Sequence, residues 1–524
     1  MKKLPIGISV LRQIREGNYI YIDKTEYAYN LIDQYKYTFL SRPRRFGKSL
    51  FLDTLQNIFE GNKELFEGLY IYNKWDWEDK YPVIKISWGG DLRTIDGVNK
   101  MVYAVLKENQ KRLGIECEIS ESPSLCFREL IQKSYKKYGK EVVILIDEYD
   151  KPILDNLDQI EVAKKCREIL KSIYIQIKES GRYIEFAFLT GVSKFSKASI
   201  FSGLNNLEDI TLTPKFGEIC GYTHKNIENE FLPYLKGVDL EELKRWYNGY
   251  NFLGDKVYNP FDILLFIRNG CEFDNYWFNT GTPSFLVKLF KSNDYNLAKF
   301  ENLEISNAIL NSFDIEELDL KTVMLQSGYL TIKKKFKRRK KTKYILTYPN
   351  LETKMSFNDY LLNYLTKSST QKGEIQNSLI DILEVADLEK LKTTLKFLFA
   401  SIAYNNFTNN YIENYEGFYA SVIYAYFAGA GFDKIIAEDV TNTGRIDLSV
   451  FIDDKIYIFE FKVNIAGALF QIIDKGYHQK YISSYNEIYI IGVEFDSKER
   501  NLVKCEWEKI DTKTCYNTTK KDKN

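Results

Sequence analysis

Residues 444–462 read Gly-Arg-Ile-Asp-Leu-Ser-Val-Phe-Ile-Asp-Asp-Lys-Ile-Tyr-Ile-Phe-Glu-Phe-Lys. Two apolar runs flank an acidic pair, a pattern that predicts two strands joined by a tight turn. Residues two apart in a strand share a face, so Glu460 and Lys462 point the same way, and Asp447 on the partner strand can reach them. Two carboxylates and a lysine in an apolar sheet favour a magnesium site beside an attacking water, the chemistry of phosphodiester cleavage. A surface cluster of ion pairs is the alternative.

Length and composition set wide limits on the rest of the chain. The 524 residues favour more than one domain, and 73 basic against 72 acidic residues leave a net charge that points to no partner. Only two histidines are present, which excludes multi-histidine metal sites, and the seven cysteines show no CxxC spacing. Without a signal peptide or a long apolar run, we expect a cytoplasmic protein with no membrane contact.

The first 215 residues alternate between strand-like and helix-like stretches. Continuous apolar runs predict buried parallel strands at 37–41, 82–88, 142–147, 184–190 and 209–212. Helical patterns at 49–59 and 161–179 lie between them. This order is typical of a doubly wound α/β domain.

Helical patterns dominate residues 216–345 and end in a strongly basic stretch. Between Lys333 and Lys343 every residue except Phe336 and Thr342 is Lys or Arg, and a strand follows. A helix followed by a basic-tipped hairpin suggests a winged helix. Such a hairpin can lie along a phosphate backbone, although a solvated hairpin tip is the simpler interpretation.

A phosphate-binding loop is predicted where the first strand ends. Ser41-Arg-Pro-Arg-Arg-Phe-Gly-Lys-Ser-Leu50 carries a strand into a Gly-Lys-Ser at a helix start. Gly47 lets the backbone approach a phosphate, Lys48 would reach the β- and γ-phosphates and Ser49 would ligate Mg²⁺. Arg42 occupies the usual leading glycine position, so it must avoid a positive φ. A lone Gly-Lys-Ser would be only a helix cap.

The second half of a nucleotide site follows the apolar strand 142–147. Asp147 would hold Mg²⁺ and Glu148 would polarise water at that strand end. The strand 184–190 places Thr190 and Ser193 where a γ-phosphate sensor would lie. Together with the loop, these residues favour ATP binding, and hydrolysis less strongly.

These motifs resemble the AAA-ATPase-like family of prokaryotes. The resemblance is carried by five stretches: Ser41–Ser49, Leu145–Pro152, Thr190–Phe195, Ile200–Leu207 and Trp246–Tyr250. In that family the Arg-Pro-Arg-Arg-Phe-Gly-Lys-Ser form is usual, so Arg42 is a family trait. Members commonly end in a PD-(D/E)XK nuclease domain, which Asp447, Glu460 and Lys462 resemble.

The resemblance also implies further site residues. A helix carboxylate often joins the metal site of such nucleases, and Glu416 fits it; Gln471 is similar to the glutamine that accompanies several branches. Lys475 and Tyr477 are candidates for phosphate contact. We expect nucleotide contacts from Arg45, Phe46, Gly47, Lys48, Ser49, Leu50 and Thr190, catalytic roles for Glu148, Asp447, Glu460, Lys462, Glu416 and Gln471, and metal ligands from Ser49, Asp147, Asp447 and Glu460.

The predicted fold class is α/β: a P-loop ATPase parallel sheet with a helical and winged-helix lid, and a C-terminal restriction-endonuclease-like domain. The expected domains are 1–215, 216–366 and 375–510, with a linker at 367–373 and a polar tail at 511–524. The expected cofactors are ATP and Mg²⁺, or Mn²⁺ in the nuclease site, and the expected partner is nucleic acid, DNA more than RNA. Homo-oligomerisation stays open.

The leading functional hypothesis is a nuclease under nucleotide control. The alternative is an ATP-dependent signalling or oligomerisation switch whose nuclease-like domain only binds a partner or nucleic acid. A nucleic-acid motor is weaker, because no arginine finger is evident beyond the candidates Arg44, Arg45 and Arg182.

Overall fold

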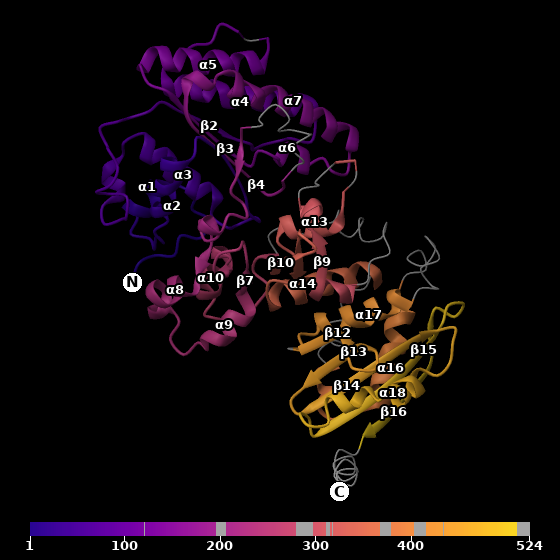
Figure 1. Cartoon of the computed structure of the whole chain (residues 1–524). Coiled ribbons are helices and arrows are strands. Elements are labelled where there is room, and N and C mark those ends of the chain that lie inside the picture. The colour runs from indigo at the N-terminus through magenta and orange to yellow at the C-terminus, as the bar shows by residue number, and fades with distance from the viewer. Residues whose placement is uncertain are drawn as a thin grey trace. The chain divides into compact units, whose positions relative to one another are not determined.

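The computed structural model describes residues 1–119, 121–194, 206–278, 297–310, 315–316, 318–366, 379–402, 416–432 and 434–510. The chain divides into two compact units. The first comprises Met1–Leu286 and Glu304–Asn350, and the second comprises Val287–Leu303 and Leu351–Asn524. Each unit is described by itself (Figure 1).

A parallel five-stranded sheet forms the centre of the first unit. The strand order is β2-β3-β4-β1-β5. The strands are β1 (Tyr37–Ser41), β2 (Val83–Ser87), β3 (Val142–Asp147), β4 (Ile184–Gly191) and β5 (Glu208–Asp209). β3 is buried along its whole length, as a strand covered on both faces requires.

Helices cover both faces of this sheet (Figure 1). They are α1 (Leu11–Glu16), α2 (Thr25–Gln34), α3 (Lys48–Phe59), α4 (Ile95–Leu113), α5 (Pro123–Tyr138), α6 (Lys151–Leu154) and α7 (Ile160–Glu179). α1, α2 and α3 pack together, and side chains such as Leu52 and Leu55 meet Leu40, Leu145 and Phe188 of the sheet in one core. α4, α5 and α7 form a second layer. These layers place the carboxyl ends of β1, β3 and β4 at one edge.

The remainder of the first unit is built from short elements. They are β6 (Tyr222–Thr223), α8 (His224–Asn226), α9 (Leu240–Tyr247), β7 (Asn248–Tyr250), β8 (Val257–Tyr258), α10 (Pro260–Arg268), β9 (Leu303–Ser306), α12 (Asn307–Leu310), α13 (Leu320–Ser327), β10 (Thr331–Arg338) and β11 (Lys341–Thr347). β6, β8 and β7 form one small antiparallel sheet, and β10, β11 and β9 form another. The helix and basic hairpin are therefore confirmed as elements; their description as a winged helix stays a prediction.

The second unit contains a mixed five-stranded sheet in the order β12-β13-β14-β15-β16. Its elements are α14 (Leu351–Thr366), α16 (Leu388–Ala400), α17 (Glu416–Gly429), β12 (Lys434–Val440), β13 (Arg445–Ile452), β14 (Lys455–Val463), α18 (Ala468–Lys475), β15 (Glu487–Asp496) and β16 (Asn501–Ile510). Only β14 and β15 pair in parallel. α17 contacts β12, β13 and β14, whereas α18 packs on β14 and β15.

Most strand predictions are confirmed, and one is too long. β1 and β3 have the predicted bounds, and the hairpin of β13 and β14 turns at Asp453 and Asp454 as expected. The predicted strand 209–212 is only β5, because Asp209 accepts a hydrogen bond from the Thr211 N–H at 2.9 Å and turns the chain there.

The sequence predicts three domains, whereas the structure divides into two compact units. The bounds of the three domains therefore stay a prediction. α14, expected within the lid, groups with the second unit and packs on α17. The predicted linker 367–373 and tail 511–524 lie outside the described residues. Within the described part of the chain, no helix has the length and apolar character needed to cross a membrane.

Candidate functional site

The predicted phosphate loop lies between β1 and the first turn of α3. Gly47 has a φ of 92° and Arg45 a φ of 68°, so the left-handed positions fall late in the loop. No heavy atom would meet a Cβ at Gly47 within 4 Å, which leaves this backbone open to a ligand. The twelve-residue helix α3 begins at Lys48, and its free N–H groups favour an anion.

Arg42 holds the start of this loop from inside. Its side chain is fully buried, and its guanidinium donates hydrogen bonds to the carbonyls of Thr211 and Phe216, each at 2.9 Å. It also lies 3.8 Å from the ring centre of Phe252. As predicted, Arg42 is not among the residues with positive φ. The arginine therefore fixes the loop by long-range contacts where a glycine would allow a turn.

Lys48 points into the loop. Its Nζ donates to the carbonyls of Arg42 and Pro43, both at 2.9 Å. Burial lowers the pKa of Lys48, while the carboxylates of Asp147 and Glu148 oppose that shift. The ammonium group is thus already desolvated, with backbone oxygens in the place that phosphate oxygens would take.

The ends of β3 and β4 supply the acidic side of the site. Asp147 is buried and accepts a 2.6 Å hydrogen bond from the Thr190 hydroxyl, so these two predicted residues are brought together. Glu148 has a φ of 53°, and its side chain lies 3.4 Å from Lys151. The strained backbone turns Glu148 out of the strand and toward the cavity.

A cavity of about 470 Å³ lies over these groups. Its lining includes all six predicted loop residues, Arg45 to Leu50, together with Glu148. Asp147 and Thr190 are not among the lining residues. Phe46 packs edge-on against Tyr250 and Phe252 with only 1% of its surface exposed, so its side chain belongs to the core.

A smaller apolar pocket of about 70 Å³ adjoins the loop. Its walls include Tyr21, Ile22 and Ile219, and it shares Gly47 and Leu50 with the larger cavity. Sequence reasoning missed this pocket, because its walls beyond the loop residues come from chain segments that carry no motif.

The second predicted site lies where β13 begins and the antiparallel strand β14 ends. Asp447 accepts a hydrogen bond from the Phe461 N–H at 2.8 Å, and Lys462 Nζ lies 3.4 Å from Glu460 Oε1. Lys462 is also 4.0 Å from Glu416, the first residue of α17. Gln471 of α18 donates to the same Glu460 oxygen. All five predicted residues converge.

Burial controls the charge of the two carboxylates. It raises the pKa of Asp447 to about 6, where the Phe461 N–H opposes the shift. It raises the pKa of Glu460 to about 8, and the nearby Asp447 adds to that shift while Lys462 opposes it. Two carboxylates that resist ionising together are an arrangement that a bound cation would relieve.

One atom of this site has no partner among the residues that the structure describes. Glu460 Oε2 is buried and accepts no hydrogen bond from them, whereas Oε1 receives both Lys462 and Gln471. An orphaned carboxylate oxygen beside a second carboxylate fits a divalent cation. Within the described residues no group of three His, Cys, Asp or Glu side chains forms a metal cage. The groups that could hold such a cation are the carboxylates of Asp447 and Glu460 and the Phe461 carbonyl.

Two residues outside the predicted set hold α18 in place. Glu494 of β15 is buried and accepts a hydrogen bond from the Gly467 N–H at 2.7 Å, at the start of this helix. A Cβ at Gly492 would lie 2.2 Å from Leu469 N, so glycine permits the close approach of helix and strand. Both contacts fix the position of Gln471, and neither has a local sequence signal.

Asp150 is a third residue that sequence reasoning missed. Its carboxylate accepts hydrogen bonds from the N–H groups of Val192 and Ser193 and from the Ser193 hydroxyl. Ser193, predicted as part of a sensor, is thereby tied to the strand end that carries Asp147. The only available signal is the acidic Asp-Glu-Tyr-Asp sequence itself.

Other predicted positions have structural surroundings. Tyr477 is buried in the core under α18, and its hydroxyl approaches Gly444. His478 lies in a short 3₁₀ helix after α18, because Gly476 ends α18 with a left-handed φ. Thr223 caps the helix that begins at His224.

Comparisons with known proteins match an N-terminal and a C-terminal part of the chain to family models. Residues 5–201 match the family model described as "Predicted AAA-ATPase", and residues 414–505 match that of the "PD-(D/E)XK nuclease superfamily". A relative in Azotobacter chroococcum mcd 1, "Uncharacterized protein in vnfD 5'region", is 45% identical over 509 residues, which cover 96% of this chain and 98% of the relative. No solved structure matches.

Proposed function

Because the chain belongs to the AAA-ATPase-like family and carries a PD-(D/E)XK nuclease superfamily domain, we propose that it is an ATP-controlled, Mg²⁺-dependent nuclease. The observation that carries the proposal is the convergence of Asp447, Glu460 and Lys462, with an unpartnered oxygen on Glu460. A surface ion-pair cluster would leave neither a buried carboxylate oxygen without a partner nor a carboxyl group with a raised pKa.

Each residue of the nuclease site has a proposed task. Asp447, Glu460 and the Phe461 carbonyl would hold Mg²⁺, which supplies an acidified water and neutralises charge on the phosphate. Lys462 faces the same space and stabilises the negative charge that develops on the phosphoryl oxygens. Gln471 restrains Glu460 through the Oε1 atom, so that Oε2 points toward the metal position. Glu416 lies farther out and acts through Lys462 or a water.

The nucleotide site has a matching division of tasks. The phosphates of ATP would occupy the cavity at the start of α3, where Lys48 exchanges backbone carbonyls for phosphate oxygens. Ser49 and Asp147 would hold Mg²⁺, and Glu148 would orient water for hydrolysis. The apolar pocket beside Gly47 suits the adenine base, since Tyr21, Ile22 and Ile219 offer uncharged walls.

The test is cleavage of supercoiled plasmid by the full chain. Wild type should nick or linearise the plasmid with Mg²⁺ or Mn²⁺ and not with EDTA, and Asp447→Ala should remove this activity. Asp474→Ala is the matched control, since Asp474 is an exposed carboxylate on α18. Equal cleavage by wild type and Asp447→Ala would refute the assignment of the site.

One observation favours a second candidate function. The Glu148 side chain forms an ion pair with Lys151, which draws it away from a water-activating role. A protein that binds ATP tightly and turns it over slowly would act as a signalling or oligomerisation switch. ATP binding with no cleavage of plasmid, combined with an ATP-dependent change in oligomeric state, would support this alternative.

A further inference from the structure

The hairpin of β10 and β11 carries positive charge on both of its faces. The pairing register places Lys334, Arg338 and Lys341 on one face and Lys335 and Lys337 on the other. All five side chains are exposed. A hairpin that packed one face on a partner protein would keep that face apolar, whereas the outer part of this one is basic on both faces.

The turn of the hairpin carries two basic residues in a backbone conformation that favours glycine and asparagine. Arg339 and Lys340 have φ values of 47° and 64°, the left-handed conformation that a two-residue hairpin turn requires. Asn and Gly are the residues that adopt this conformation most easily. Two long basic side chains occupy these positions instead, at the outermost point of the hairpin.

We propose that this hairpin binds a groove of double-stranded DNA, and that the nucleotide site controls the affinity of the hairpin for DNA. The inference rests on the proposed function, since it names the surface that would hold the nuclease's substrate. A two-stranded ribbon fits the major groove of B-form DNA, which is about 12 Å wide and has a phosphate rim on each side. Charges on both faces of the ribbon match both rims.

The geometry favours duplex DNA over duplex RNA. The major groove of A-form RNA is deep and narrow, and a β-ribbon cannot enter it. Phe336 is the only aromatic residue between Lys333 and Lys343, too few for a stacking platform that would favour single strands. The contact is therefore mainly electrostatic and depends on phosphate geometry rather than on base sequence.

The base of the hairpin is joined to the nucleotide site through α13. A Cβ at Gly328, the residue that ends α13, would lie 2.8 Å from the Cβ of Pro43 in the phosphate loop. Gln326 of α13 accepts a 2.8 Å hydrogen bond from the N–H of Lys194, just beyond the predicted sensor Ser193. α13 therefore contacts both halves of the nucleotide site.

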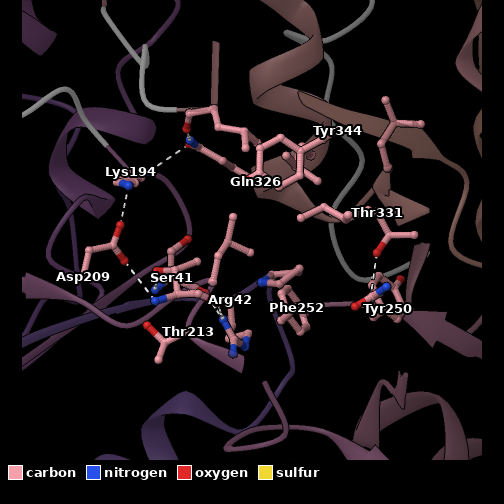
Figure 2. Close-up of a pocket in the computed structure, with 18 of the residues that line it drawn as sticks. Ser41, Arg42, Lys194, Asp209, Thr213, Tyr250, Phe252, Gln326, Thr331 and Tyr344 are labelled. Atoms are coloured by element: carbon pink, nitrogen blue, oxygen red, sulfur yellow. Dashed lines mark hydrogen bonds and ion pairs between the residues drawn. The ribbon is translucent and has the colours of Figure 1, made fainter. Parts of the chain in front are cut away.

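Pro43, Lys194 and Gln326 line a cavity of about 260 Å³ (Figure 2). Ser41 and Arg42 lie on its loop side, and Thr331 and Tyr344 of the hairpin lie on the other. Thr331 is also the hydrogen-bond acceptor for the N–H of Asn251 at 2.8 Å. Free volume at this junction allows the hairpin base to shift without compressing a packed core.

The coupling follows from the partners of Lys48. When phosphate replaces the Arg42 and Pro43 carbonyls, the loop at Pro43 loses two hydrogen bonds that fix it. Pro43 abuts Gly328, so the change reaches α13 and the hairpin base. Linkage requires reciprocity: if ATP changes the affinity for DNA, DNA changes the affinity for ATP by the same factor.

The first test measures binding of a fluorescein-labelled duplex by anisotropy. The full chain carries Asp447→Ala throughout, so that Mg²⁺ can be present without cleavage. The hairpin variant Lys337→Gln/Arg338→Gln/Lys341→Gln should bind at least about tenfold more weakly at 0.15 M salt. The slope of the logarithm of the association constant against the logarithm of salt concentration should become less steep by about three. Each phosphate contact contributes about 0.9 to this slope, and the variant removes three basic residues.

The matched control also removes three exposed positive charges. Lys107→Gln/Lys111→Gln/Lys136→Gln lies on α4 and α5 and should change affinity less than twofold. Equal losses in both triple variants, no loss in the hairpin variant, or tighter binding of an RNA duplex of the same sequence would overturn the proposal. With Asp447 intact, plasmid cleavage by the hairpin variant at the wild-type rate would overturn the proposal while leaving the nuclease itself in place.

The second test addresses the coupling. A non-hydrolysable ATP analogue should change the affinity for the duplex several-fold, and Gln326→Ala should bring this ratio close to one. Gln326→Glu keeps the acceptor for the Lys194 N–H and should keep the ratio. A duplex affinity that does not respond to the analogue in the Asp447→Ala chain would refute control of the hairpin by the nucleotide site.

Discussion

The phosphate loop and the carboxylate–lysine site both combine a lysine with acidic residues, yet they hold their charges in opposite ways. Lys48 is buried with both nearby carbonyls as hydrogen-bond partners, so the loop is satisfied before a ligand arrives. Glu460 is buried, has a raised pKa, and keeps one oxygen to which no described residue donates a hydrogen bond. To bind phosphate, the loop would have to exchange the hydrogen bonds of Lys48 to carbonyls for hydrogen bonds to phosphate. The carboxylate–lysine site is already assembled and lacks only a cation to balance its carboxylates.

This difference matters for regulation. A site that exchanges internal hydrogen bonds changes its own loop on binding, and it can therefore pass a signal to its neighbours. A preformed site gains charge compensation with little movement, which suits chemistry. Under the proposed function, the loop would therefore serve control and the carboxylate site catalysis.

The largest expected effect is on cleavage. Lys462→Ala should lower the rate of plasmid cleavage by roughly 10²- to 10³-fold, because a positioned cation is lost next to the developing phosphoryl charge. The unfolding midpoint should change little. Lys455→Ala, at the other end of β14, is the control and should cleave normally. Retained cleavage in Lys462→Ala would remove this lysine from the catalytic set.

The next effect is on nucleotide binding. Lys48→Ala should weaken ATP binding by at least about 100-fold in calorimetry, since it removes charge-assisted hydrogen bonds to phosphate. Lys36→Ala, an exposed lysine just before β1, should bind ATP normally. Normal ATP affinity in Lys48→Ala would show that the loop is not the phosphate site.

The pH dependence of stability separates the two sites further. Burial raises the pKa of Glu460 from 4.5 to about 8, so between these values the folded chain holds a proton that the unfolded chain releases. Its contribution to stability is therefore greatest below about pH 4.5 and falls as pH rises to about 8. In EDTA, Glu460→Gln should gain on the order of 2 kcal/mol over wild type between pH 5.5 and pH 8.5 in urea unfolding.

The exposed carboxylate Asp474 provides the control for this titration. Asp474→Asn should show no gain over the same pH range. Addition of Mg²⁺ should reduce the difference between wild type and Glu460→Gln at pH 8.5, because the cation replaces the proton. If the unfolding free energies of Glu460→Gln and wild type differ by the same amount at both pH values, the pKa of Glu460 is not raised by burial.

The smallest expected effect comes from Gln471. Gln471→Ala removes one hydrogen bond to Glu460, which corresponds to about 1 kcal/mol and a cleavage rate roughly five- to tenfold lower. The Mg²⁺ concentration for half-maximal cleavage should rise at the same time, since Glu460 loses a restraint. Gln479→Ala, outside the site, should leave both quantities unchanged. An unchanged Mg²⁺ requirement in Gln471→Ala would assign Gln471 a structural role alone.

Elements whose residues lie close together in the sequence were predicted correctly. The β13–β14 hairpin was predictable because the two apolar runs that form its strands and the acidic turn between them lie within twenty residues of sequence. The proximity of Asp447 to Glu460 followed from adjacent pairing. Glu416 and Gln471 were found through family resemblance, since neither strand pairing nor spacing places them.

Long-range contacts were not predictable. The carbonyl partners of Arg42 lie at Thr211 and Phe216, far along the chain, so its role as an internal pin has no local signal. The shortening of β5 has a similar cause: Thr211 uses its hydroxyl to accept the Ser41 N–H in place of a backbone partner. Glu494 meets the start of α18 only after β14 and β15 have paired.

The most direct measurement is the rate of plasmid cleavage at fixed Mg²⁺ with and without ATP, for wild type beside Lys48→Ala. We predict that ATP changes the wild-type rate and that Lys48→Ala cleaves at one rate in both conditions, because its nuclease site is intact and its control site is not. Equal rates with and without ATP in wild type would contradict nucleotide control, and an equal ATP response in both proteins would contradict its assignment to this loop.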